Sequence, residues 1–296
     1  MLDEFKSAFS RSNNGHVQLI IINVVTFLAV GVVWVVAKIS GFESVFTIVH
    51  DQFSIPPVFT DFITRPWTII TYAFMHSLSD IFHILGNMLV LYWFGKLFIE
   101  YLGSDKLVAL YILGALAAGM SYLIIFNTIP FFKEQSNFSG MVGASGAVYA
   151  IMVGAATLLP NYTFFLMFIG PVKIKYIAGF FIAISFLGTV QHNAGGNIAH
   201  LGGALMGFIY IKQLQVGVNW GGWLTSLLDW FRNLFAAQPK VKVSYRKNEP
   251  SNVKKTSNLS GISQKEIDEI LDKISDGGYE SLTKDEKEKL FKASKK

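Results

Sequence analysis

The sequence contains no cysteine among its 296 residues and few charged residues. Without a thiol, the protein can form neither disulfide bridges nor thiolate metal sites, and a cysteine nucleophile is excluded. Charged residues make up 15% of the chain, against roughly 25% in an average soluble protein. Hydrophobic residues reach 52%, with 26 phenylalanines. A soluble domain of this size could not shield so much apolar surface from water, so the composition indicates a membrane protein.

The formal net charge of +5 comes almost wholly from the C-terminal part of the chain. From Lys240 onward, 14 lysines and arginines face 10 aspartates and glutamates, which leaves a surplus of 4 positive charges. The residues before this point are nearly neutral. The surplus therefore belongs to a polar tail that can touch anionic lipid, and it gives no reason to expect nucleic acid as a partner.

Six apolar runs are candidates to cross a bilayer, whose hydrocarbon core of about 30 Å needs roughly 20 helical residues. The first run has no charge before Lys38 and no small-residue cleavage site after it, so it is a span rather than a signal peptide. We therefore predict an all-α membrane protein, a six-transmembrane-helix bundle. Its spans are expected at residues 17–39, 81–102, 107–126, 142–159, 176–187 and 198–214.

Further segments surround this bundle. Residues 1–16 are expected to be an N-terminal cytoplasmic segment, and 17–215 hold the six spans. At 216–236, tryptophan and leucine recur at helical spacing, which predicts an amphipathic helix lying on the membrane. A polar linker over 237–262 leads to a small cytoplasmic helical hairpin at 263–296.

The hairpin is predicted from two helix start signals. Ser263 with Glu266, and Thr283 with Glu286, are capping boxes. In this motif the hydroxyl and the glutamate satisfy each other's free backbone amides at the start of a helix. The sequence therefore predicts two short helices here, with no catalytic constellation.

The loop between the first two spans is unusually aromatic. Over 42–80, phenylalanine, tryptophan and tyrosine are interleaved with polar residues, a pattern that does not span a membrane. We expect a partly embedded structure, held at headgroup depth by Trp67 and Arg65.

Loop charges suggest an orientation and a location. The first loop is mainly acidic, whereas Lys173, Lys175 and the tail are basic, and basic loops tend to face the cytoplasm. We expect both termini in the cytoplasm. No organellar presequence is evident, which favours the inner membrane of a bacterial cell. The second, fourth and sixth spans then begin at the outer side.

Polar side chains lie near the start of each of these three spans. Ser145 begins the fourth span, His200 the sixth and His83 the second. Such groups inside a membrane are costly and usually functional. A serine hydroxyl becomes a good nucleophile when a nearby base takes its proton, and histidine is the usual base. Because an aspartate partner would be expensive here, a Ser145–His200 dyad is more plausible than a triad.

Neighbouring residues support the dyad. Tyr149 follows Ser145 by four residues on the same helical face and is placed to pack against the His200 imidazole. His83 and Asn87, also four apart, can join the Ser145 amide in donating hydrogen bonds to a developing oxyanion. Glycines near both dyad residues would let the two helices approach closely: Gly143, Gly146, Gly203 and Gly207.

These motifs together resemble the rhomboid family of intramembrane serine proteases: Gly143-Ala-Ser-Gly-Ala147, Ala199-His-Leu-Gly-Gly203 with Gly207, and His83-Ile-Leu-Gly-Asn87. Trp67 after Arg65-Pro66 is similar to that family's first-loop motif with the order reversed. The resemblance covers about residues 59–210. It implies a six-helix bundle, the Ser145–His200 dyad and an oxyanion site of His83, Asn87 and the Ser145 amide. It also implies no metal or cofactor, and substrates that are transmembrane segments of other proteins.

Two further functions stay open at this point. A non-catalytic rhomboid-like protein would bind or escort client helices, but loss of Ser145 or His200 would mark it and both are present. A transporter would carry charged or broken helices near the midplane, to which Pro171 and its neighbouring lysines lend some support. The nucleophile elbow of α/β-hydrolases is excluded, because Ala147 replaces its last glycine and no strand precedes it.

Overall fold

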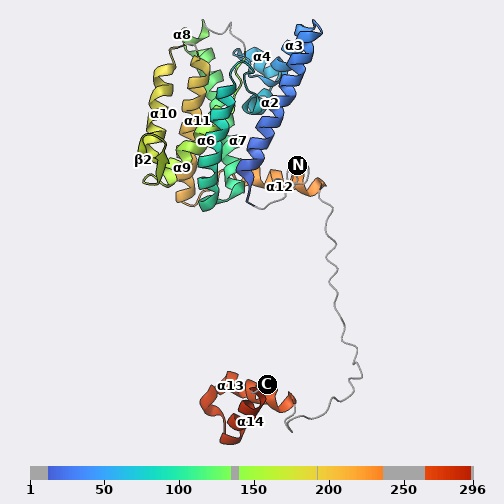
Figure 1. The fold of residues 1–296 in the computed structure, drawn as a ribbon, viewed down its shortest axis with the longest axis vertical. Coiled ribbons are helices and arrows are strands. Elements are labelled where there is room, and N and C mark those ends of the chain that lie inside the picture. Colours follow the sequence, from blue (N-terminus) through green and yellow to red (C-terminus); the bar gives the residue numbers. More distant parts are fainter. Residues whose placement is uncertain (1–12, 135–139, 192, 236–263, 295–296) are drawn as a thin grey trace. The chain divides into compact units, whose positions relative to one another are not determined.

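The computed structural model describes residues 13–134, 140–191, 193–235 and 264–294. The chain divides into two compact units, Met1–Ala237 and Gln238–Lys296. The first unit is a bundle of helices and the second a small helical unit (Figure 1). The N-terminal segment at 1–12 and the linker at 236–263 lie outside the described residues.

Six helices form the bundle, one for each apolar run, which confirms the predicted all-α membrane fold. Length and composition make α2, α6 and α7 able to cross a membrane, while α9 and α10 are apolar but shorter. The helices are α2 (Gly15–Ile39), α6 (Ile81–Leu102), α7 (Ser104–Thr128), α9 (Ser145–Leu158), α10 (Ile174–Gly188) and α11 (Ala194–Gln215).

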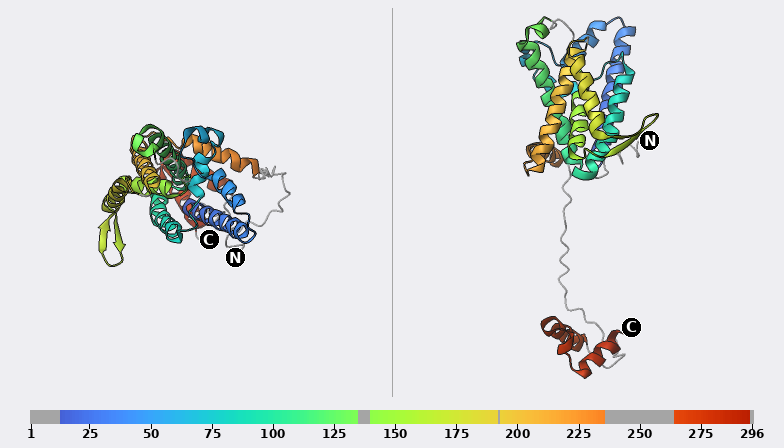
Figure 2. Two further views of the ribbon diagram at one scale, coloured as in Figure 1. Left: turned by 90° about the horizontal axis from the view of Figure 1, so that it is seen from above. Right: turned by 90° about the vertical axis from the view of Figure 1, so that its left-hand side faces the viewer.

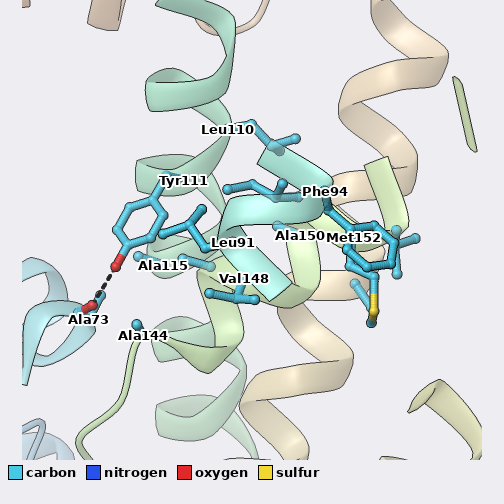
Figure 3. Close-up of a cluster of buried hydrophobic side chains, with 14 of the residues drawn as sticks. Ala73, Leu91, Phe94, Leu110, Tyr111, Ala115, Ala144, Val148, Ala150 and Met152 are labelled. Atoms are coloured by element: carbon cyan, nitrogen blue, oxygen red, sulfur yellow. Dashed lines mark hydrogen bonds between the residues drawn. The ribbon is translucent and has the colours of Figure 1, made fainter. Parts of the chain in front are cut away.

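Helix α9 is the centre of this bundle. It packs against α6, α7, α10 and α11, and most of its side chains are buried. Its 14 residues include four alanines and two glycines, so large side chains can approach its backbone: a Cβ at Gly154 would lie 2.9 Å from Leu110 Cδ2. Leu91, Phe94 and Ala150 belong to the same buried cluster (Figure 3). The helix begins at Ser145, three residues later than predicted, because Gly143 has a φ of 142°, outside the helical region.

The first loop folds into short helices that fasten it to the bundle. They are α3 (Glu43–Phe53), α4 (Phe59–Thr64), α5 (Thr68–Thr71) and η1 (Tyr72–Phe74). The Tyr72 hydroxyl donates to the Ala115 carbonyl at 2.7 Å, and Tyr111 of α7 donates to the Ala73 carbonyl at 2.7 Å (Figure 3). Ile55 and Met141 exchange two backbone hydrogen bonds of 3.0 and 2.8 Å. The loop is therefore tied both to α7 and to the chain before α9.

Arg65 and Trp67, expected to sit at headgroup depth, also have partners within the protein. The Arg65 guanidinium donates to the Asp51 carbonyl at 2.6 Å, and the Trp67 indole N–H donates to the Gln52 carbonyl at 2.8 Å. Both bonds cap the C-terminal end of α3, whose last carbonyls have no partner within the helix. These two side chains therefore hold α3 against α4 and α5.

A β-hairpin, which the sequence did not reveal, precedes α10. Strand β1 (Thr163–Leu166) pairs antiparallel with β2 (Gly170–Lys173), with Thr163 opposite Lys173. The turn uses Phe168 and Gly170, both at positive φ. The hairpin projects sideways from the bundle (Figure 2). The six predicted spans leave this position, between 159 and 176, without an assigned element.

The remaining helices flank the bundle or form the second unit. α8 (Pro130–Lys133) follows α7. α12 (Gly222–Phe235) contacts α7, and its Leu224 is buried. The second unit holds α13 (Gln264–Gly277), η2 (Tyr279–Ser281) and α14 (Lys284–Ser294).

The predicted capping box at the start of α14 is formed. The Thr283 N–H donates to the Glu286 carboxylate at 2.7 Å, and the Glu286 N–H donates to the Thr283 hydroxyl at 3.4 Å. Hydrogen bonds from Thr283 and Lys273 lower the pKa of Glu286 to about 2. The first predicted box includes Ser263, which lies outside the described residues.

Candidate active site

Ser145 and His200, predicted to act together, are in hydrogen-bond contact. The Ser145 hydroxyl oxygen lies 2.7 Å from His200 Nε2. Ser145 is the first residue of α9, and His200 lies in the second turn of α11. Ser145 is 8% exposed, so the pair is enclosed by protein. This geometry allows the histidine to take the serine proton directly.

Glycines on α11 explain how two such short side chains can meet. A Cβ at Gly203 would overlap the carbonyl oxygen of Gly146, and a Cβ at Gly207 would overlap that of Ala150. The backbones of α9 and α11 are therefore in direct contact, as expected for small residues at a helix interface. Gly143 differs from the other glycines, because it lies before α9 and its positive φ is what requires glycine.

Tyr149 and a residue absent from the sequence prediction, Ser185, surround the His200 ring. The rings of Tyr149 and His200 are stacked, with centroids 4.2 Å apart and an angle of 10° between their planes. The Ser185 hydroxyl, from α10, lies 3.1 Å from His200 Nδ1 and 2.9 Å from the Tyr149 hydroxyl. Both nitrogens of the histidine thus have a hydroxyl partner.

His83 and Asn87 lie at the start of α6, near a second histidine that the sequence analysis did not single out. A Cβ at Gly143 would lie 3.8 Å from His83 Nε2, which puts the His83 ring beside the turn that precedes Ser145. The Asn87 amide nitrogen is 3.3 Å from Nε2 of His76, which is buried. Burial and the nearby His83 lower the pKa of His76 to about 4. His76 is therefore neutral near pH 7 and can accept the hydrogen bond from Asn87.

A cavity of about 480 Å³ lies next to this group. The residues in its wall include Ser77, Asp80, His83, Tyr122, Val142 and Asn193. Val142 is directly before the Gly143 turn. The cavity is polar enough and large enough to admit water beside the residues described above.

Comparison with protein families identifies the fold. The model of the Rhomboid domain matches residues 64–215, which is just over half of the chain. The chain belongs to the rhomboid family. The match includes Ser145, His200, His83 and Asn87. A second model, a family of unknown function called DUF6576, matches residues 253–296, the part that contains α13 and α14.

Curated rhomboid proteins align with about half of the chain. RHOMBOID-like protein 12, mitochondrial, from Arabidopsis thaliana is 37% identical over 163 residues, 52% of this chain and 48% of that protein. Rhomboid protein 1, mitochondrial, from Saccharomyces cerevisiae is 31% identical, over 51% of this chain and 42% of that protein. Presenilin-associated rhomboid-like protein, mitochondrial, from Mus musculus is 30% identical, over 45% of this chain and 34% of that protein. The chain thus spans half or less of the length of these relatives.

These relatives contradict the expected location. The sequence favoured the inner membrane of a bacterial cell with both termini cytoplasmic, whereas the three relatives above are named as mitochondrial proteins of a plant, a yeast and a mouse. The assignment to a bacterial membrane is therefore wrong. That assignment rested on the absence of an evident presequence, which does not identify the membrane, and loop charges distinguish only its two sides.

Proposed function

We propose that the chain is an intramembrane serine endopeptidase that cleaves transmembrane segments of other proteins near the membrane surface. The observation that carries the proposal is the 2.7 Å contact between the Ser145 hydroxyl and His200 Nε2 at the enclosed start of α9. Membership of the rhomboid family supports it. The mitochondrial names of the relatives support a mitochondrial membrane as the setting.

In the proposed reaction, His200 acts as general base. Its Nε2 takes the proton of Ser145 while the serine oxygen bonds to the substrate carbonyl carbon. The carbonyl electron pair moves to the oxygen, which becomes an oxyanion. His200 then gives the proton to the leaving amine, and an acyl-enzyme remains. Water from the cavity beside His83 hydrolyses this ester, again with His200 as the base.

The oxyanion needs hydrogen-bond donors, and we propose three, of which the first is the Ser145 amide. The first N–H groups of a helix have no carbonyl partner within it, and Ser145 is the first residue of α9. We assign the other two donors to His83 and Asn87 of α6. Loss of one such donor typically costs about 3–4 kcal/mol of barrier.

Catalysis is assigned to the bundle over 17–215. The six-helix bundle contains every residue of the proposed mechanism, whereas the hairpin at 263–296 matches a separate family. The helix at 216–236 is proposed to lie on the membrane, with Trp223 exposed and Leu224 buried against the bundle.

A cleavage assay on the purified protein in liposomes tests the proposal. With a transmembrane substrate, Ser145→Ala and His200→Ala are expected to reduce cutting to background, since each removes a group that the chemistry requires. A fluorophosphonate probe should label the parent protein and not Ser145→Ala. Ser121→Ala is a suitable control, because the Ser121 hydroxyl bonds only its own helix at the Ala117 carbonyl among the described contacts. Unchanged cutting by Ser145→Ala would contradict the proposal, and binding of client helices without cutting would favour the escort alternative.

A further inference from the structure

We propose that Ser185 is a positioning residue that keeps His200 protonated at Nδ1, so that Nε2 is free to act as the base. The inference rests on the proposed function of the Ser145–His200 pair. It adds a third, uncharged member to a site that the sequence predicted as a dyad.

The contacts of Ser185 fit this role. It lies on α10, is 1% exposed, and places its hydroxyl between two groups of the site. The hydroxyl oxygen is 3.1 Å from His200 Nδ1 and 2.9 Å from the Tyr149 hydroxyl. Tyr149 continues the chain of contacts, because its hydroxyl lies 3.5 Å from the Phe181 carbonyl oxygen. Three helices, α9, α10 and α11, therefore meet in one hydrogen-bonded chain.

The contact between Tyr149 and the Phe181 carbonyl determines which atom donates in each hydrogen bond of this series. A backbone carbonyl can only accept, so Tyr149 donates its proton to Phe181. The Tyr149 oxygen then accepts the proton of Ser185. Ser185 has no second proton, so its oxygen accepts from His200, which must carry hydrogen at Nδ1. Nε2 of the neutral ring is consequently the acceptor that faces Ser145.

The opposite direction would leave the site unproductive. If Tyr149 donated to Ser185 and Ser185 to Nδ1, Nε2 would carry the hydrogen and could not take the Ser145 proton. When Nε2 does take it, the ring becomes an imidazolium, and its Nδ1–H needs an acceptor. Ser185 provides one without placing a carboxylate in the membrane interior, where an ionised group is costly. No proton passes beyond Nδ1, and the one on Nε2 goes to the leaving amine.

Nitrogen NMR of the full-length protein labelled on histidine tests the tautomer directly. In a neutral imidazole the protonated and unprotonated ring nitrogens have well-separated chemical shifts, and His200→Gln identifies the signals of His200. We expect hydrogen on Nδ1 in the parent protein and a mixture of both tautomers in Ser185→Ala. A parent protein with hydrogen on Nε2, or a Ser185→Ala spectrum with the parent tautomer, would overturn the inference.

Kinetics provides a second readout. Ser185→Ala is expected to lower kcat on the order of tenfold with KM nearly unchanged, a smaller loss than the roughly 10⁴-fold effect of neutralising the carboxylate in a Ser-His-Asp triad. Ser185→Thr keeps a hydroxyl and should retain most of the parent rate. Tyr149→Phe keeps the stacked ring but removes the acceptor for Ser185, so an intermediate loss is expected.

A matched control separates positioning from packing. Ser121→Ala removes a hydroxyl from α7 at a position that lies against Gly202 of α11. It should leave both kcat and the tautomer unchanged, and an equal loss in Ser121→Ala and Ser185→Ala would overturn the inference. The NMR measurement does not depend on turnover. If Ser145→Ala cuts normally, the proposed function fails, and the tautomer still reports on Ser185 by itself.

Discussion

At the scale of single residues, the hydrogen bond from Asn87 to His76 affects how the Asn87 amide is oriented. Asn87 was predicted as an oxyanion donor, but the orientation of its amide depends on the hydrogen bond to His76 Nε2. That bond requires His76 to be neutral, and its pKa of about 4 ensures this at physiological pH. The same burial makes the folded protein sensitive to acid.

The lowered pKa of His76 predicts that acid destabilises the fold. In the unfolded chain this group returns to a pKa of 6.5, so between pH 6.5 and about 4 the unfolded state binds more protons. The contribution to stability is complete above pH 6.5 and is lost as the pH falls through this window. The full shift is worth at most about 3 kcal/mol. We expect the thermal unfolding midpoint in detergent to fall as the pH decreases. His76→Gln should reduce the slope of this midpoint against pH.

Ser77→Ala is the matched control, since it changes the residue next to His76 and removes no titratable group. It should keep the slope of the parent protein. A slope that His76→Gln leaves unchanged would show that other groups cause the acid sensitivity.

The sequence identified some of these residues and not others, for a physical reason. Ser145, His200, His83 and Asn87 stand at the starts of three spans, and helical spacing predicts which of them share a face. Ser185 carries no such pattern, because its contact with His200 depends on how α10 packs against α11. His76 lies in a loop, where no periodicity indicates the direction of a side chain. The single serine in the apolar run at 176–187 was the available signal for Ser185.

At the scale of elements, the contact between α9 and α11 determines the site. Gly203→Ala would place a methyl group on the carbonyl of Gly146 and push the two helices apart. Overpacking of this kind typically costs about 1–3 kcal/mol. We expect a lower unfolding midpoint and a large loss of cutting, because the serine and the histidine share this interface. Circular dichroism melts and the liposome assay measure the two effects.

Gly179→Ala on α10 is the control for this substitution. A Cβ at Gly179 meets nothing within 4 Å, and alanine is favoured over glycine inside a helix by about 1 kcal/mol. This variant should be as stable as the parent protein or more so, with normal activity. Equal damage from both substitutions would argue against the close backbone contact as the cause.

The helices were predictable because each is a continuous apolar run, and the boundaries of α6 agree with the predicted ones. The hairpin of β1 and β2 was not, because each strand has four residues and depends on cross-strand hydrogen bonds rather than on a long periodic pattern. The start of α9 was predicted three residues early, since hydropathy does not register the positive φ of Gly143.

At the scale of the whole molecule, the two units are expected to be separable in function. All residues of the proposed mechanism, with their hydrogen-bond partners, lie in Met1–Ala237. A site for a specific protease, inserted into the linker near residue 250 of the full-length protein, allows the second unit to be detached after purification. We expect the cutting rate in liposomes to stay within about twofold after detachment, because every residue of the proposed mechanism remains in the first unit.

Treatment of the unmodified protein with the same protease provides the control. A loss of activity that appears only after the linker is cut would show that the second unit regulates the bundle.

The late start of α9 has a consequence for the first loop. Fourteen residues at about 1.5 Å each cover roughly 21 Å, less than a bilayer core of about 30 Å, so irregular backbone must continue α9 at membrane depth. Irregular backbone at that depth is tolerated only where it is buried in protein or lines a cavity that holds water. The loop supplies the missing partners. The backbone carbonyl of Tyr72 accepts from the Gly143 N–H at 3.0 Å, and Ile55 and Met141 exchange two backbone hydrogen bonds. Displacing the loop would thus break these three backbone hydrogen bonds, and an extended peptide that pairs with the same amides and carbonyls would replace them.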